Sequence, residues 1–188
     1  MTVSLMLMTL RIREIEGMNR IRSMVILGLI ISQALILHLL EGYMPVLAPG
    51  MKLGLANIMT LVTLTFFGFK EALIVIAIRS ILGSLLAGGV TAILYSLAGG
   101  ILSCLVMGCL YYKFRSYFSV IGISTAGAIF HNIGQLSVAS WMFGSAGILF
   151  SYLPVLTVAA LGTGFFVGLA SNYIIKYLQH RWFIWERG

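Results

Sequence analysis

The stretch EGYMPVLAPGMKLGLAN, residues 41–57, decides the fold, because it is the polar, turn-rich break in the first half of an otherwise apolar sequence. Pro45 and Pro49 each fix φ and lack a backbone donor, and Gly50 adds a bend, so a helix does not continue through this stretch. We predict that it forms a loop between two helices and covers the mouth of a membrane binding site as a lid.

The composition outside this loop is that of a membrane protein. Of the 188 residues, 60% are hydrophobic and 9% are charged, and the mean hydropathy is +1.05. So few polar residues do not cover a soluble globule. The 21 glycines agree, because small residues let membrane helices approach closely. We predict an all-α integral membrane protein with one membrane domain.

Six apolar runs are each about long enough to cross a hydrocarbon core of roughly 30 Å. They comprise residues 24–40, 53–69, 72–88, 92–112, 117–143 and 148–173. The uncharged stretch 116–175 has room for two long helices or three short ones. Two fit better, with a break at 144–147, because a seventh span would export the basic C-terminal residues against the positive-inside tendency.

The predicted protein is therefore a six-transmembrane-helix bundle of the cell membrane, multi-pass, with both termini cytoplasmic. This topology places ten basic residues on the cytoplasmic side: Arg11, Arg13, Arg20, Arg22, Lys70, Lys113, Arg115, Lys176, Arg181 and Arg187. We divide the chain into a cytoplasmic tail at 1–22, the membrane domain at 23–175 and a basic cytoplasmic tail at 176–188. Met18 is a second plausible start within the first tail.

The formal net charge of +7 does not indicate a nucleic-acid partner, because the basic residues are scattered at the ends of apolar runs. Cys104 and Cys109 fall in one run at a spacing that puts them on different helix faces. They indicate neither a disulfide nor a metal site, and we interpret both as small core residues.

Two groups of polar residues fall inside the apolar runs. Arg79 either faces the interior, where it binds an anionic group or helix carbonyls, or extends toward the cytoplasmic interface; the interior role is favoured. His131, Asn132 and Gln135 form the densest polar patch, with His131 and Gln135 on one helix face. They either hydrogen-bond between helices or line a cavity, and Gln135 is the nearer of the pair to the outer side.

A third group of polar and aromatic residues is expected near the outer face, where it would form the walls of a small-molecule pocket. Its members are Glu41, Tyr43, Lys52, Asn57, Tyr95 and Tyr152. Tyr95 and Tyr152 taken individually fit an interfacial aromatic belt better than a pocket.

Small residues spaced four apart form stripes on three runs. The stripes are Gly28 with Ser32; Ser80, Ser84 and Gly88; and Ala160, Gly164 and Gly168. Packing within the bundle is the general interpretation of such stripes. For Gly28 and Ser32 the alternative is docking of a partner subunit, because the first run also borders the predicted lid.

Several catalytic chemistries have no counterpart in this sequence. It contains no aspartate and no P-loop, and its five glutamates are dispersed. We therefore expect no enzyme activity, no cofactor, no metal site and no prenyl transfer by this chain. A membrane enzyme built on His131 and Glu41 would need the two close together, whereas we place them at different depths.

The order of these features resembles a known family of membrane subunits. KLGLAN at 52–57 with the overlapping NIMTL at 57–61, FGFKEAL at 67–73 and IRSILGSLLAGG at 78–89 follow a short first span and a proline-containing outer loop. Over residues 20–175 the chain resembles the S-components of energy-coupling factor transporters. Within them it is most similar to the Gx transporter family, also labelled heptaprenyl diphosphate synthase component I.

The resemblance implies a non-enzymatic, six-helix subunit that captures a vitamin, a cofactor precursor or a quinone or isoprenoid precursor at its outer side. Its partners would be a membrane coupling subunit and two ATPase subunits, with Gly28 and Ser32 at the position that docks the coupling subunit. Asn57, with Lys52 or Arg79, would meet the polar end of the ligand. The alternative is a non-catalytic membrane subunit, component I, of a heptaprenyl diphosphate synthase in quinone biosynthesis.

Overall fold

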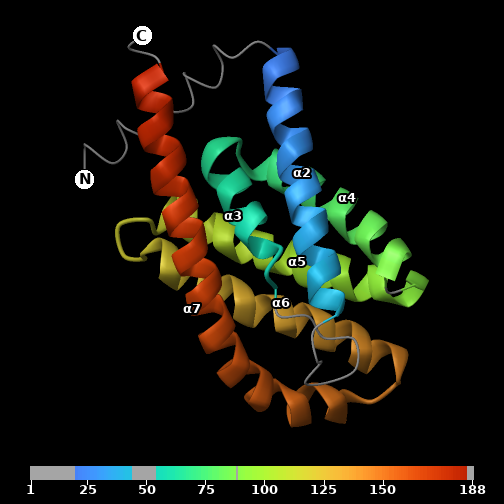
Figure 1. Ribbon diagram of the computed structural model, residues 1–188. Coiled ribbons are helices and arrows are strands. Elements are labelled where there is room, and N and C mark those ends of the chain that lie inside the picture. Colours follow the sequence, from blue (N-terminus) through green and yellow to red (C-terminus); the bar gives the residue numbers. More distant parts are fainter. Residues whose placement is uncertain (1–19, 44–53, 88, 186–188) are drawn as a thin grey trace.

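The computed structural model describes residues 20–43, 54–87 and 89–185. Within these ranges the chain forms six helices and no strands (Figure 1). The helices are α2 (Arg20–Gly42), α3 (Asn57–Phe66), α4 (Phe69–Ala87), α5 (Gly89–Lys113), α6 (Val120–Met142) and α7 (Ala146–Trp185). The all-α class is confirmed, as is the division of 116–175 between two helices. The predicted lid lies mostly outside the described residues, as does Lys52.

Helix α3 is shorter than its apolar run predicts. Its ten residues span about 15 Å, roughly half of a hydrocarbon core. Every residue from Asn57 to Thr65 is buried, and α3 contacts all five other described helices. The prediction of a full span at 53–69 is therefore wrong. The run is apolar because its helix is enclosed by protein on all sides, and hydropathy does not distinguish that from a lipid-facing helix.

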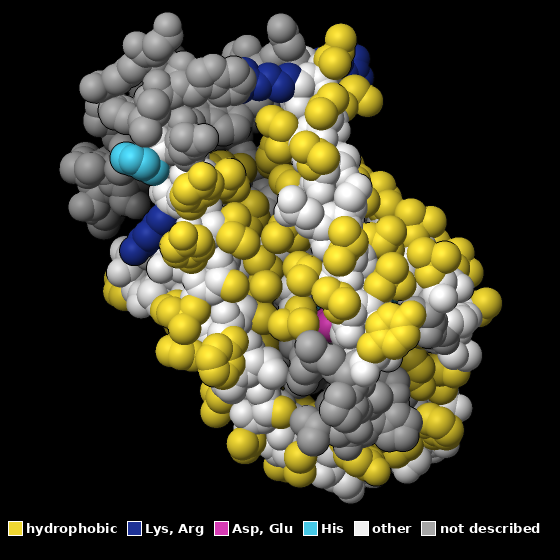
Figure 2. Space-filling view, viewed as in Figure 1, with side chains coloured by type: hydrophobic (Ala, Val, Ile, Leu, Met, Phe, Trp, Pro, Cys, Tyr) yellow, Lys and Arg dark blue, Asp and Glu magenta, His cyan; other side chains and the backbone are white. Residues whose placement is uncertain are grey.

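Three described helices are long and apolar enough to cross a membrane, judged by length and composition: α2, α5 and residues 146–180 of α7. Helix α4 carries Lys70, Glu71 and Arg79, and α6 carries His131 and Gln135 among other polar residues. Hydrophobic side chains cover most of the face shown in Figure 2. These features fit a protein embedded in a bilayer.

The start of α2 and the end of α7 lie at the same end of the bundle (Figure 1). Helix α3 runs opposite to α2, since its first turn meets Glu41 near the end of α2. Its C-terminal end meets the end of α5, where the Tyr112 hydroxyl donates to the Leu64 carbonyl over 3.1 Å. The described basic residues other than Arg79 belong to α2, α4, α5, α7 and the turn between α5 and α6: Arg20, Arg22, Lys70, Lys113, Arg115, Lys176 and Arg181.

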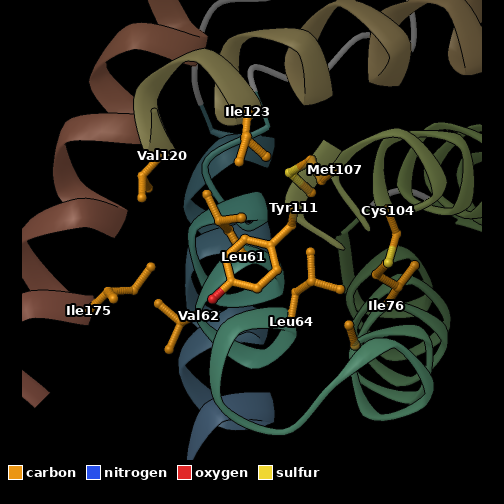
Figure 3. Packing of buried hydrophobic residues seen from close by; sticks show 11 residues of the cluster. Leu61, Val62, Leu64, Ile76, Cys104, Met107, Tyr111, Val120, Ile123 and Ile175 are labelled. Atoms are coloured by element: carbon orange, nitrogen blue, oxygen red, sulfur yellow. The ribbon is translucent and has the colours of Figure 1, made fainter. Parts of the chain in front are cut away.

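The main hydrophobic core surrounds α3 on the side of its C-terminal end (Figure 3). Leu61, Val62 and Leu64 of α3 lie at its centre. Side chains from α4, α5, α6 and α7 complete it: Ala72, Ile76, Cys104, Met107, Tyr111, Val120, Ile123 and Ile175. The N-terminal end of α3 lies beyond this core. There Ile58 and Met59 belong to a second hydrophobic cluster with side chains of α2, α4 and α7, whereas Asn57 meets a polar side chain.

Two of the three small-residue stripes pack within the bundle over their described residues, as predicted; Gly88 lies outside the described residues. On α4, the Ser80 hydroxyl accepts a 3.1 Å hydrogen bond from Ser96 of α5. On α7, a Cβ at Gly164 would lie 2.6 Å from the Cα of Thr125, so α6 and α7 are in close backbone contact there. Cys104 is buried and Cys109 is exposed. The two cysteines therefore lie on different faces, but the prediction of a core position for Cys109 is wrong.

Helix α7 has 40 residues, about 60 Å, and includes Pro154. It continues through residues 176–185, so the predicted boundary between the membrane domain and a basic tail at 175 is not a helix end. No glycine or proline occurs between Gly168 and Gly188 to stop it. In Figure 1 the helix changes direction in its first half, as expected of a helix that contains a proline.

Candidate functional site

The side chain of Glu41 is tied to the turn that precedes α3. Glu41 is 6% exposed, and its carboxylate accepts a hydrogen bond from the backbone N–H of Leu55. Ala56 occupies the N-cap of α3 and offers no side-chain acceptor. A carboxylate at this position is favourable, because the N-terminal end of a helix carries partial positive charge. Glu41 therefore ties the end of α2 to the turn that leads into α3.

Arg79 and Asn57 form the second link in this region. Nη2 of Arg79, on α4, donates to Oδ1 of Asn57, the first residue of α3, over 2.9 Å. Arg79 is 1% exposed and Asn57 is 4% exposed. The prediction of an interior-facing Arg79 is confirmed, and the alternative in which it extends to the interface is wrong. Glu41 is close enough to attract the charge of Arg79.

The hydrogen bonding of Arg79 is incomplete in the described part of the chain. Its Nε is fully buried there and has no hydrogen-bond partner. A buried donor without an acceptor costs about 1–3 kcal/mol, and more where the group is charged. Such a group is expected to find an acceptor in a bound molecule or in water. Arg79 is thus the side chain best placed to meet a ligand.

Two neighbouring glycines of α5 let α4 and α6 pack closely against α5 near Arg79. A Cβ at Gly99 of α5 would lie 2.8 Å from the carbonyl oxygen of His131 and 2.9 Å from Cγ of Gln135. A Cβ at Gly100 would lie 3.4 Å from Nη2 of Arg79. Helices α4 and α6 therefore contact neighbouring glycines of α5, and the pair Gly99–Gly100 connects Arg79 with His131 and Gln135.

His131 also adjoins the turn before α3. Gly54 in that turn has φ of +84°, which a glycine adopts without strain. A Cβ there would lie 3.0 Å from Nδ2 of Asn57 and 4.0 Å from Cδ2 of His131. Glu41 binds the next residue, Leu55. The expectation that Glu41 and His131 lie at different depths is therefore not supported, since both adjoin one turn.

We name these residues the polar layer: Glu41, Asn57, Arg79, His131 and Gln135, with the glycines between them. They come from α2, α3, α4 and α6, and all five are buried. The layer lies at the N-terminal end of α3, about 15 Å along that helix from its C-terminal end. Five of the seven predicted substrate-binding residues thus come together.

The other two predicted substrate-binding residues do not join this layer in the described structure. The Asn132 side-chain nitrogen donates to the Leu156 carbonyl over 3.1 Å and so links α6 to α7. A neighbour of His131 in sequence points about 100° away from it around the helix, which explains this separation. Lys52 lies outside the described residues.

The predicted pocket wall is wrong for Tyr43, which is 86% exposed. Tyr152 is 43% exposed and also lies outside the buried layer, which fits the interfacial belt favoured for it. Tyr95 is half-buried. The layer is instead bordered by hydroxyl groups that sequence patterns did not single out. Thr60 follows Asn57 by one turn of α3, and Ser103 follows Gly99–Gly100 by one turn of α5.

The stripe on α2 differs from those on α4 and α7. Nothing lies within 4 Å of a Cβ built at Gly28, and Ser32 is exposed, with its hydroxyl donating to the Gly28 carbonyl over 2.9 Å. Packing within the described bundle is therefore excluded for this stripe. The docking role predicted for it stays a prediction.

The described side chains limit the chemistry open to the polar layer. No group of three or more His, Cys, Asp or Glu residues that could hold a metal ion occurs among the residues that were described. The layer instead offers one guanidinium, one carboxyl group, two amides and one imidazole in a buried setting. Such a set recognises a polar group by hydrogen bonds and charge.

The fold and this layer define a helical membrane protein with a polar site enclosed among its helices. The chain belongs to the family described as heptaprenyl diphosphate synthase component I, whose family model matches residues 30–174. That description names one component of a multi-subunit assembly. Comparisons with curated proteins and with solved structures found no significant match.

Proposed function

We propose that this chain is the substrate-binding subunit of an energy-coupling factor transporter, embedded in the cell membrane as a multi-pass protein. It would capture a small vitamin, cofactor precursor or quinone or isoprenoid precursor from outside. The observation that carries the proposal is the polar layer, in which four helices bring charged and amide side chains to one buried level around Arg79. Buried polar groups with incomplete hydrogen bonding favour a binding role over a purely structural one.

The sequence contains neither a P-loop nor a recognised catalytic motif, which supports a binding role over a catalytic one. Without a P-loop the chain has no means of its own to use ATP by that route, so energy for uptake would come from partners. In this proposal the partners are a membrane coupling subunit and two ATPase subunits. The uncovered face of α2, with Gly28 and Ser32, is the surface we assign to the coupling subunit.

Purification of the tagged chain from its native membrane tests the assembly. We expect a membrane coupling subunit and two ATPase subunits to co-elute with it. The variant G28L should lose these partners, and G162L is the matched control, because Gly162 of α7 also has nothing within 4 Å of a built Cβ. Co-elution of an Asp-rich soluble synthase in place of ATPases would contradict the transporter role.

Ligand capture has its own test. The purified protein, in phosphatidylcholine nanodiscs, is screened for thermal stabilisation against vitamins, cofactor precursors and quinone and isoprenoid precursors. One class should stabilise the wild-type protein and K113Q, but not R79Q, which makes the same charge change in the polar layer. If no compound stabilised the wild-type protein, the capture role would be abandoned.

The family description favours a second candidate, a non-catalytic membrane subunit of a heptaprenyl diphosphate synthase. Such a subunit would hold a soluble catalytic partner at the bilayer, and the polar layer would then serve only the stability of the bundle. The co-elution experiment separates the two candidates by the partner found.

A further inference from the structure

We propose that the polar layer receives a ligand head with a single negative charge, of the carboxylate class, and rejects a diphosphate. This inference rests on the proposed capture function and adds the chemical class of the ligand. The geometry points to it through the donors left on Arg79, the charges around them and the hydroxyl groups one turn away.

The donors on Arg79 match a carboxylate. Nη2 donates to Asn57, whereas Nε is buried and has no acceptor in the part of the chain that the structure describes. Nε and Nη2 lie on one edge of the planar guanidinium, and a carboxylate presents two oxygens at the spacing of such an edge. One oxygen would accept from Nε, and the other would share Nη2 with Asn57.

The charges of the layer disfavour a head with more than one negative charge. Among the described residues, Arg79 is the single buried Lys or Arg side chain. Glu41 lies near it and accepts from the N–H of Leu55, so the layer already holds one carboxyl group. Each additional negative charge on a ligand would be repelled by Glu41 without gaining a second described cation. A diphosphate, which needs several cations or a metal ion, is poorly matched to this setting.

Two buried hydroxyl groups extend the site toward the hydrophobic core. The Thr60 and Ser103 hydroxyls are fully buried and have no hydrogen-bond partner within the described ranges. Thr60 lies about 4.5 Å further along α3 than Asn57. These hydroxyls could donate to the oxygens of a head group that Arg79 holds, whereas the apolar cluster beyond them suits a hydrocarbon body.

The experiment uses four probes with the same ten-carbon apolar body and different heads: geraniol, geranoate, geranyl phosphate and geranyl diphosphate. Their dissociation constants are measured on the full-length protein in phosphatidylcholine nanodiscs. We expect geranoate to bind at least tenfold more tightly than either geraniol or the diphosphate. In R79Q the dissociation constant of geranoate should rise to that of geraniol. In K113Q the order of the four dissociation constants should be unchanged.

A second variant tests the charge argument without removing Arg79. E41Q deletes the nearby negative charge and keeps an acceptor for Leu55. It should improve binding of geranyl phosphate relative to geranoate by at least threefold. If E41Q weakened the binding of all probes equally, Glu41 would have a structural role alone, and the charge argument would be contradicted.

The outcomes separate this inference from the proposed function. Tighter binding of the diphosphate than of geranoate, lost in R79Q, would overturn the ligand class and leave capture intact. Equal binding of all four probes would also overturn the ligand class, because the protein would then recognise only their shared apolar body. Absence of binding by all four probes would overturn the carboxylate assignment, and capture itself would be judged by the broad stabilisation screen.

Discussion

Arg79 of α4 donates to the side-chain oxygen of Asn57, the first residue of α3, over 2.9 Å, and both side chains are buried. This link fixes the N-terminal end of a helix that every other described helix surrounds. It pairs the guanidinium of Arg79, whose burial in a bilayer is unfavourable, with a side chain at the start of a helix. At that position the first backbone N–H groups have no acceptor within the helix. The predictions below follow from this arrangement.

Replacing Asn57 by Leu should destabilise the protein by about 3 kcal/mol, because Arg79 would lose its described acceptor while staying buried. N57D is the matched control, since an aspartate keeps an acceptor for the guanidinium. The free energy of unfolding, measured by denaturant titration in mixed micelles, provides the test. Equal stability of N57L and wild type would show that the link contributes nothing.

Replacing Glu41 by Ala removes both the acceptor for Leu55 and the negative charge at the start of α3. We expect a loss of about 1–2 kcal/mol, because the buried N–H of Leu55 would lose its acceptor and the helix N-terminus a favourable carboxyl group. E41Q keeps an acceptor and should lose less. Hydrogen exchange of the Leu55 amide reports the contact directly, and protection unchanged in E41A would contradict the assigned hydrogen bond.

Gly99 of α5 and Gly134 of α6 should tolerate no side chain. A Cβ at Gly99 would lie 2.8 Å from the His131 carbonyl oxygen, and one at Gly134 would lie 2.7 Å from the Ala98 carbonyl oxygen. G99A and G134A should each destabilise by about 1–3 kcal/mol through overpacking. G162A is the control, because nothing lies near its Cβ. A destabilisation of G162A equal to that of G99A would contradict overpacking as the cause, because exchanging glycine for alanine in an open helical position is otherwise favourable.

The uncovered stripe on α2 should matter for assembly and not for folding. G28L and S32L should leave the unfolding free energy within about 0.5 kcal/mol of wild type, because both positions are exposed. Both should reduce recovery of partner subunits from membranes, measured by quantitative mass spectrometry. Full recovery of partners with both variants would exclude this face as a docking surface.

Much of the fold could be predicted from the sequence because apolar length and turn residues are local signals. The helix break at Gly144, where φ is +63°, follows from such a signal. The length of α3 could not be predicted in this way. Residues 53–69 carry no charge and are mostly apolar, and the packing of the neighbouring helices reveals that the run is enclosed and its helix short.

The candidate site was predictable in part. An arginine within an apolar run needs polar surroundings, which predicts that Arg79 faces the interior. The structure confirms this, since Arg79 is buried. Asn132 was grouped with His131 and Gln135 by proximity in sequence, although helical periodicity places it on another face. The contact of Glu41 with Leu55 joins residues on either side of the loop, and no local pattern encodes such a contact.

An experimental structure with a bound ligand tests the central claim most directly, through the distance from Nε of Arg79 to the nearest ligand atom. The account predicts a ligand oxygen at about 2.9 Å from Nε, within the polar layer at the start of α3. A ligand bound elsewhere, with Nε of Arg79 still lacking an acceptor, would contradict it.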